Sequence, residues 1–178
     1  MEGVEESRAL YPKDAGLLGR PPRANGDRPM TPEQELMSGV AKTIFRLNGQ
    51  LIALAEHMAR PAGLTAAWWQ VLGLVLSDPL PVVEIARNVG VTRQSVQRVA
   101  DLLVDRGLAE YLPNPAHRRA KLLCPTSEGR AAVRRIGPSH AAFARRLADE
   151  VGAEHLQRTL DDLTQLSKAL DVLDPARR

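Results

Sequence analysis

The stretch from residue 84 to residue 121 constrains the fold of this chain more than any other part. Apolar residues recur there at helical spacing as far as Val89, and a second helical pattern runs from Thr92 to Asp105. Between them, Gly90 suits a tight backbone turn that a larger residue would resist. After Gly107 the residues alternate loosely, which predicts a two-stranded hairpin. The stretch therefore predicts two short helices at a sharp turn, followed by a hairpin.

The remaining ordered sequence is helical. Thr31-Pro32-Glu33 predicts the start of a first helix of about 27 residues, ended by Pro61 and Gly63. A second helix is expected over Ala66–Leu76 and a fifth after Thr126, where Gly137-Pro138 predicts a kink or a break. The last helix follows Gly152, and its leucines repeat at a spacing near seven, which favours packing of helix on helix.

Composition supports a mainly helical protein. Hydrophobic residues make up 44% of the 178 residues but aromatic residues only 3%, so the core must consist of aliphatic side chains. Residues 1–30 are rich in proline and glycine without apolar periodicity, and we expect a flexible arm. No apolar run approaches the roughly 18 residues of a membrane span. The first residues, MEGVEES, do not resemble a signal peptide, so we expect a soluble cytoplasmic protein.

Positive charge is concentrated around the helix pair and the hairpin. The whole chain has a formal net charge of +3, but residues 81–135 hold ten cations against five anions. A basic segment in an otherwise nearly neutral chain indicates a polyanionic partner on one face.

The second helix of the pair carries side chains that can read DNA. Val96, Val99 and Leu103 form one apolar stripe, which should be buried. Arginine can pair with guanine and glutamine with adenine in the major groove, while serine and threonine contact phosphates. Residues of these types occupy the opposite face and the N-terminal end of the helix: Thr92, Arg93, Gln94, Ser95, Gln97 and Arg98. An ordinary polar surface helix is the alternative interpretation of this segment alone.

The hairpin supports the DNA interpretation. Its tip is cationic, with His117, Arg118, Arg119 and Lys121 close together. A charged run is usually only solvated, but directly after a helix-turn-helix it fits a wing that reaches a minor groove or a phosphate. Duplex DNA is therefore the predicted partner.

Three segments resemble the multiple antibiotic resistance regulator (MarR) family of bacterial winged helix-turn-helix repressors. They are LTAAWWQVL, VVEIARNVGVTRQSVQRVADLLVDRGLAEY and NPAHRRAKLLCPTSEGR. The resemblance is strong over residues 64–135 and weaker, though congruent in order and length, over 33–63 and 136–173. Residues 1–30 lie outside it.

The wing departs from the family pattern. Family members typically have Asp-Pro-x-Asp-Arg-Arg, whereas this chain has Asn114-Pro115-Ala116-His117-Arg118-Arg119. The resemblance makes Arg119 the best candidate for a minor-groove contact. The family aspartate that holds the wing arginine is replaced by His117, so we expect a looser or more cationic wing tip.

The resemblance implies a mainly α fold with a small β-hairpin wing. It implies a homodimer built from residues 31–62 and 127–174, with a DNA-binding lobe over residues 63–126. The two recognition helices would read half-sites of a pseudo-palindromic operator about one DNA turn apart. Repression is the more usual activity in the family, and many members release DNA when a small aromatic or anionic effector binds between the two regions.

The adjacent Trp68 and Trp69 bear on such an effector. Neighbouring residues on a helix cannot both face the core, so one should be buried. The other is a candidate to line a ligand pocket with His57 and Arg60. Plain packing of both indoles is the alternative.

The sequence favours neither an enzyme nor a metalloprotein. It contains no nucleophile triad, phosphate-binding glycine loop or paired-carboxylate cluster, so we expect no catalytic residues and no cofactor. The histidines lack the spacing of a helical metal site, and the single cysteine, Cys124, excludes a thiolate cluster and should be structural. A winged-helix module that binds protein instead of DNA is the remaining alternative, although an exposed face of arginine and glutamine disfavours it.

Overall fold

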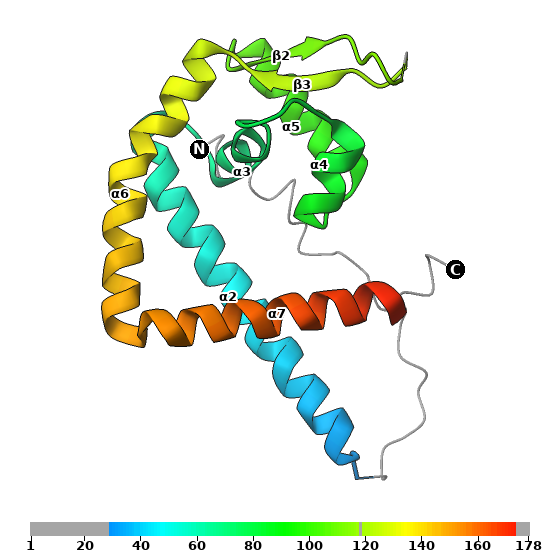
Figure 1. Cartoon of the computed structure of the whole chain (residues 1–178), viewed down its shortest axis with the longest axis vertical. Helices are drawn as coiled ribbons and strands as arrows, with labels where there is room; N and C mark the ends of the chain where they lie inside the picture. The colour runs from blue at the N-terminus through cyan, green and yellow to red at the C-terminus, as the bar shows by residue number, and fades with distance from the viewer. Residues whose placement is uncertain (1–28, 118, 174–178) are drawn as a thin grey trace. The chain divides into compact units, whose positions relative to one another are not determined.

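The computed structural model describes residues 29–117 and 119–173. The chain divides into two compact units, the first ending at Ile136 and the second beginning at Gly137. The elements of the first unit (Figure 1) are α2 (Pro32–Ala59), the 3₁₀ turn η1 (Arg60–Ala62), α3 (Ala66–Leu74), β1 (Leu80–Pro81), α4 (Val82–Val89), α5 (Arg93–Asp105), β2 (Ala109–Leu112), β3 (Leu122–Pro125) and the start of α6 (Ser127–Val151). The second unit holds the rest of α6 and α7 (Ala153–Leu173).

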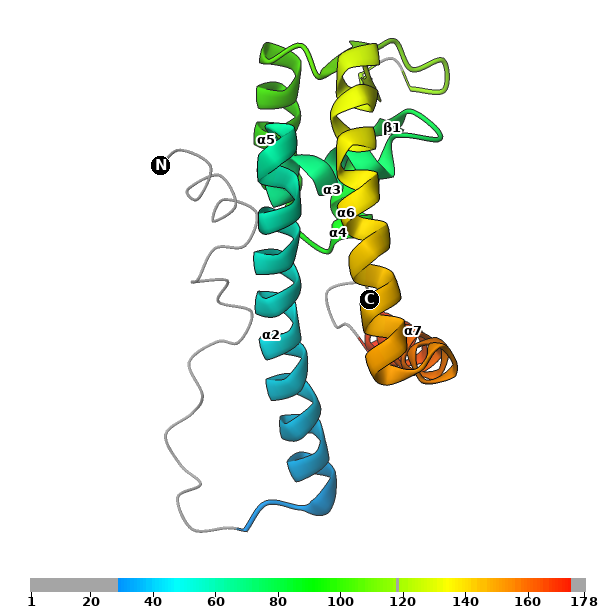
Figure 2. The ribbon, with the colours of Figure 1, turned by 90° about the vertical axis from the view of Figure 1, so that its left-hand side faces the viewer.

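The long helix α2 begins as its sequence predicts. The Thr31 hydroxyl accepts the backbone N–H of Gln34 at 3.3 Å, and the Gln34 side chain accepts the backbone N–H of Thr31 at 2.9 Å. This reciprocal capping box satisfies two backbone donors that a helix start leaves without partners. Figure 2 shows α2 as one uninterrupted helix along its length.

A capped junction joins α2 to α3. Gly63 has φ +75°, the left-handed conformation that glycine adopts without strain. The backbone N–H of Ala66 donates to the Glu56 carboxylate at 2.7 Å, and Trp68 N–H donates to the Thr65 hydroxyl at 3.1 Å. A carboxylate at the N-terminus of a helix also interacts favourably with the helix dipole. The start of α3 is therefore anchored to the end of α2.

Aliphatic side chains form the core, as the composition predicts. The largest fully buried side chains come from α3, α4, α5, β3, the start of α6 and the residue after α3: Leu72, Ile85, Leu103, Leu123, Ile136, Val71, Val75, Val96 and Val99. Each such side chain stabilises the fold by about 1.5–3 kcal/mol through burial. The core thus lies in the first unit and surrounds the inner face of α5.

The sheet contains one strand more than the predicted hairpin. β2 and β3 pair antiparallel with Tyr111 opposite Leu123, which confirms the hairpin. β1 pairs with the other edge of β3, with Leu80 opposite Leu123, and gives the strand order β1-β3-β2. The sequence did not indicate β1 because it has only two residues, one of them a proline, and shows no alternating pattern.

Of the predicted kink or break at Gly137-Pro138, the break does not occur, and the kink stays a prediction. The helix α6 continues through Pro138 from Ser127 to Val151. A proline inside a helix removes one backbone hydrogen bond and crowds the preceding turn, and the turns on either side can keep the helix intact despite this cost. The division between the two compact units falls at the same place, between Ile136 and Gly137.

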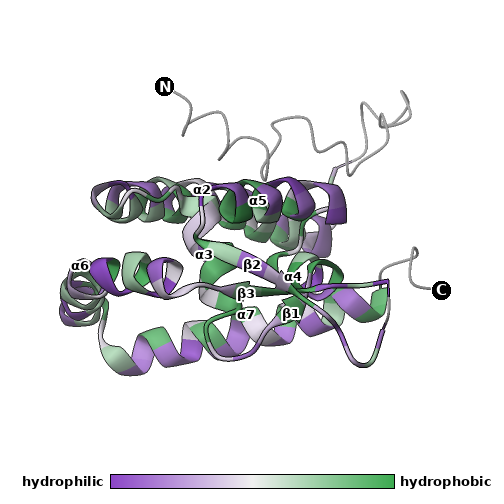
Figure 3. Cartoon of the chain, turned by 90° about the horizontal axis from the view of Figure 1, so that it is seen from above, coloured by the Kyte–Doolittle hydropathy of each residue, from purple (hydrophilic) through white to green (hydrophobic). Residues whose placement is uncertain are grey.

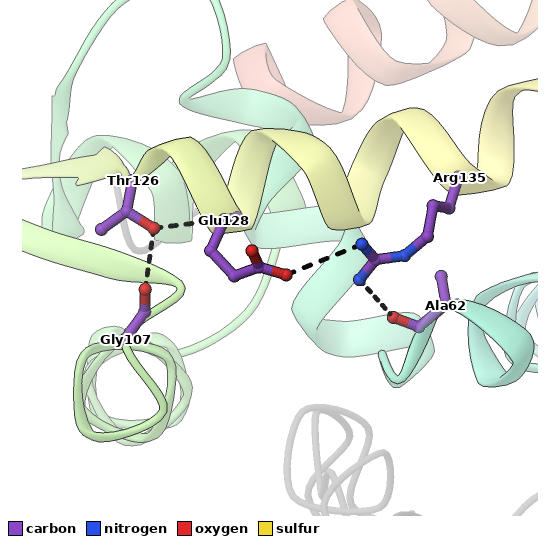
Figure 4. Close-up of polar contacts among 6 residues, drawn as sticks. Ala62, Gly107, Thr126, Glu128 and Arg135 are labelled. Carbon is purple, nitrogen blue, oxygen red and sulfur yellow. Dashed lines mark hydrogen bonds and ion pairs between the residues drawn. The ribbon is translucent and has the colours of Figure 1, made fainter.

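The first turns of α6 are attached to the first unit by specific polar contacts (Figure 4). The Thr126 hydroxyl accepts the backbone N–H of Gly129 at 3.1 Å and donates to the carbonyl oxygen of Gly107 at 2.7 Å. Arg135 donates to the Ala62 carbonyl oxygen at 3.3 Å and lies 3.6 Å from the Glu128 carboxylate. The turn after α5 and the end of η1 are therefore both joined to the start of α6.

Gly129→Ala should destabilise the protein. A methyl group at this position would overlap the backbone carbonyl oxygen of Leu108, which cannot move without disturbing β2. We expect the free energy of unfolding to fall by about 1–3 kcal/mol. Gly73→Ala in α3 is the matched control, because nothing lies within 4 Å of the added methyl. Urea denaturation followed by circular dichroism measures both, and equal stability of the two variants would contradict the packing described.

Candidate nucleic-acid interface

The turn between α4 and α5 is set by a glycine and a small helix residue. Gly90 has φ +75°, and the backbone N–H groups of Gly90 and Val91 both donate to the Ala86 carbonyl oxygen, at 3.0 and 3.1 Å. Ala86 is buried, with 5% of its surface exposed. The predicted sharp turn is confirmed, and it brings the N-terminus of α5 to the surface.

A threonine cap begins α5. The Thr92 hydroxyl accepts the backbone N–H of Ser95 at 3.2 Å and lies 2.9 Å from the Ser95 hydroxyl. Both hydroxyl groups are thereby held at the positive end of the helix dipole, where a phosphate is favourably bound.

The two faces of α5 differ as the sequence predicts. Val96, Val99 and Leu103 are 0–1% exposed and pack in the core. On the outer face Arg93, Gln94 and Arg98 are exposed. Because the buried stripe fixes the rotation of the helix, the polar face points outward as a unit.

Gln97 differs from its neighbours because it is held by two other side chains. Its amide nitrogen donates to the Asp101 carboxylate at 2.9 Å and to the Tyr111 hydroxyl at 2.7 Å. The Tyr111 hydroxyl in turn donates to the same Asp101 oxygen at 2.8 Å. This Gln97–Asp101–Tyr111 triad joins α5, the predicted recognition helix, to strand β2 of the wing, which is the β2–β3 hairpin with its connecting loop.

The environment keeps the Tyr111 phenol protonated. Burial is the main cause that raises the pKa of Tyr111 above its usual range, followed by the hydrogen bond to Asp101 and the negative charge of Asp101. The hydrogen bond from Gln97 acts in the opposite direction. Tyr111 therefore remains a hydrogen-bond donor to Asp101 at neutral pH.

The wing carries exposed basic side chains beside α5. His117, Arg119 and Lys121 are exposed, and Lys121 lies over the Tyr111 ring with its ammonium 5.9 Å from the ring centroid. The predicted contact residue Arg118 lies outside the described residues, as do residues 1–28 of the predicted arm.

A turn organises the tip of the wing. The Asn114 side chain accepts the backbone N–H of Ala116 at 2.9 Å, and the Asn114 carbonyl accepts that of His117 at 3.2 Å. Asparagine at this position thus forms a side-chain turn that an aspartate also forms.

One cavity brings the recognition helix and the wing together. It has a volume of about 700 Å³ and lies between the start of α4, the N-terminal half of α5 and the wing. Its lining includes five predicted contact residues: Arg93, Gln97, His117, Arg119 and Lys121. Gln94, Ser95 and Arg98 of α5, and the N-cap residue Thr92, are not among the residues that line this cavity.

The residues predicted to line a ligand pocket are separated. Trp68 is buried, with the Arg106 guanidinium 5.3 Å from its ring centroid, whereas His57 and Arg60 are exposed. Trp69 lines a cavity of about 460 Å³ together with residues of α2, α3 and α4, and Trp68, His57 and Arg60 are not among the residues that line it. The sequence did not indicate the other lining residues, although four of them follow helical spacing along α2: Asn48, Leu51, Ile52 and Ala55.

The described residues do not form a metal site. They contain no cluster of three or more histidine, cysteine, aspartate or glutamate side chains that could hold an ion. Cys124 is half-buried at the end of β3. Over the same residues, no helix is both long and apolar enough to cross a membrane.

Comparison with known proteins identifies the family. A family model described as "MarR family" matches residues 62–120. An uncharacterised protein of Mycobacterium tuberculosis is 42% identical over 132 residues, which are 74% of this chain and 92% of that protein. The chain belongs to the MarR family. It is a DNA-binding transcription regulator with a winged-helix fold and not an enzyme, as the sequence predicts.

Further similarities agree with this MarR assignment. A helix-turn-helix transcriptional regulator of Bacillus cereus is 28% identical over 121 residues, 67% of this chain and 80% of its own length. The transcriptional repressor CouR, solved bound to a 23-mer DNA duplex, superposes with a TM-score of 0.65 at 26% identity. That match covers 78% of this MarR chain and 99% of CouR.

Proposed function

We propose that this MarR-family regulator is a homodimeric repressor in which α5 enters the major groove and the wing contacts the adjacent backbone or minor groove. The observation that carries the proposal is the shared cavity of Arg93, Gln97, His117, Arg119 and Lys121. Side chains for base contacts and cations for phosphate contacts are adjacent there, which suits one stretch of duplex. CouR, a repressor bound to duplex DNA, supports the repressor assignment.

The residues proposed to contact DNA fall into two groups. Arg93, Gln94, Gln97 and Arg98 on the outer face of α5 read bases or position the helix, while Thr92 and Ser95 contact a phosphate. His117, Arg119 and Lys121, with Arg118 beside them in the sequence, anchor the wing. The protein-binding alternative is disfavoured because protein interfaces have apolar centres and this surface is polar and cationic.

Dimerisation is proposed from large apolar side chains that are exposed in the described part of the chain. In α2, Leu36 is 70% exposed and Leu51 61%, and in α7, Leu160 is 58% exposed and Leu170 47%. Both hydrophobic and hydrophilic residues occur along α7 (Figure 3). Its leucines recur at steps of three, four and seven, so they lie on one face of the helix: Leu156, Leu160, Leu163 and Leu170. Such exposed stripes indicate an interaction surface. We assign residues 31–62 and 127–174 to the dimer contact, so that two DNA-binding lobes address one pseudo-palindrome.

The cavity beside Trp69 is the proposed effector site. Its lining is mainly apolar, from Leu51, Ile52, Leu74 and Val89, with amide groups from Asn48 and Asn88. An aromatic ring would fit between the apolar residues while a polar substituent bonds to the amides. Among the described residues, no lysine, arginine or histidine lines the cavity, so a hydrogen-bonding aromatic compound is favoured over a simple anion. Because the proposed partner is DNA, we also propose a cytoplasmic location.

The DNA proposal predicts an arginine-dependent salt effect. Each phosphate neutralised contributes about −0.9 to the slope of log affinity against log salt. Arg119→Ala should make that slope about 0.9 less steep and weaken binding roughly five- to tenfold at moderate salt. Arg145→Ala removes the same charge from an exposed position of α6 and serves as the control. Fluorescence anisotropy of a labelled duplex measures both, and identical slopes for the two variants would contradict the wing contact.

The dimer proposal predicts a molar mass twice that of the 19.4 kDa chain in light scattering at micromolar concentration. Leu163→Glu places a charge in the exposed apolar stripe of α7 and should shift the mass toward the monomer, because charge burial opposes association. Gln165→Glu introduces the same charge at an exposed polar position and should leave the dimer intact. A wild-type monomer would refute the proposal.

The effector proposal predicts a change in tryptophan fluorescence on titration with aromatic acids and phenols. The chain has two tryptophans, and only Trp69 lines the cavity. Trp69→Phe should therefore remove the response, whereas Trp68 with its arginine partner should not report binding. Flat fluorescence across the panel, or an unchanged response in Trp69→Phe, would exclude this cavity.

A further inference from the structure

The side-chain amide of Gln97 has no hydrogen left to offer a base. A glutamine amide nitrogen carries two hydrogens. One is donated to Asp101 at 2.9 Å and the other to the Tyr111 hydroxyl at 2.7 Å. Both donors are therefore used within the protein, although Gln97 lies on the face of α5 proposed to meet DNA.

The chemistry of the partners fixes this arrangement. An ionised carboxylate only accepts hydrogen bonds, so the amide nitrogen and not the amide oxygen must face Asp101. The single hydrogen of Tyr111 is donated to Asp101 at 2.8 Å, which leaves the phenol oxygen to accept from Gln97. Each of the three groups thus acts in the only way compatible with the other two.

The arrangement changes what Gln97 can read. A glutamine recognises adenine by donating to N7 while accepting from the N6 amino group. We propose that Tyr111 and Asp101 determine part of the sequence specificity by holding both amide hydrogens of Gln97, so that it meets DNA as an acceptor only. This inference rests on the proposed function, in which α5 lies in the major groove. Tyr111 is then a positioning residue that acts from the wing strand through Gln97.

An acceptor alone does not distinguish the amino group of adenine from that of cytosine, because both donate in the major groove. The wild-type protein should therefore show no glutamine-dependent selection for adenine at the base that faces Gln97. Releasing the amide should create that selection. A gain of adenine selection depends on which base is bound, so a variant that merely lost structure would not produce it.

The experiment is selection of bound duplexes from a random pool with the full-length protein and a double variant, Tyr111→Phe with Asp101→Ala. The double variant frees both amide hydrogens, and phenylalanine keeps the ring beneath Lys121. We expect adenine to be enriched about fivefold or more at one position of each half-site, the lower range for a good bidentate contact. Adding Gln97→Ala to the double variant should abolish the enrichment.

The controls separate this inference from the proposed function. Loss of the Asp101 charge should raise affinity for all duplexes alike, which leaves the ranking of bases unchanged. If the double variant does not fold by circular dichroism, Tyr111→Phe alone frees one hydrogen and supports the same comparison. If the double variant enriches sequences with the same ranking of bases as the wild type, the inference is overturned and the proposed function stands. Adenine selection by the wild type that disappears in Gln97→Ala would also overturn it, and no enrichment by any variant would overturn the proposed function itself.

Discussion

The burial of one face of α5 is the constraint on which the rest of this structure depends. Val96, Val99 and Leu103 are essentially inaccessible, and they pack among side chains from α3, α4 and the sheet. Rotating the helix would expose these side chains at a cost of about 1.5–3 kcal/mol each. The outward direction of Arg93 and Arg98 is therefore set by the core behind them.

Polar contacts then fix the wing relative to the outer face of α5. Tyr111 on β2 is hydrogen-bonded to Asp101 and Gln97 on α5. Thr126, which follows β3, is hydrogen-bonded to Gly107 in the turn between α5 and β2. The wing is thus held to α5 through Tyr111, and its two strands are held together near Gly107 and Thr126. These contacts place Arg119 and Lys121 beside the N-terminal half of α5. The Asp101 carboxylate, unfavourable near phosphate in isolation, is occupied by two donors in this arrangement.

Features governed by local chemistry could be predicted from the sequence, and those governed by distant contacts could not. The Gly90 turn, the Thr31 and Thr92 caps and the buried stripe of α5 follow from residue type and spacing over a few positions. The short strand β1, the continuity of α6 through Pro138 and the lining of the Trp69 cavity depend on neighbours from other elements. The same holds for the triad, since Tyr111 lies 14 residues from Gln97 along the chain and the spacing carries no signal. The family resemblance indicated the fold correctly but did not indicate these contacts.

Amide hydrogen exchange with and without a bound duplex tests most directly the claim that α5 and the wing together form the DNA-binding surface. DNA should slow exchange at the N-terminal half of α5 and at residues 114–121 of the wing, while the start of α3 exchanges as in the free protein. Protection confined to one of the two elements would show that they do not act together. Protection elsewhere, with α5 and the wing unchanged, would contradict the account.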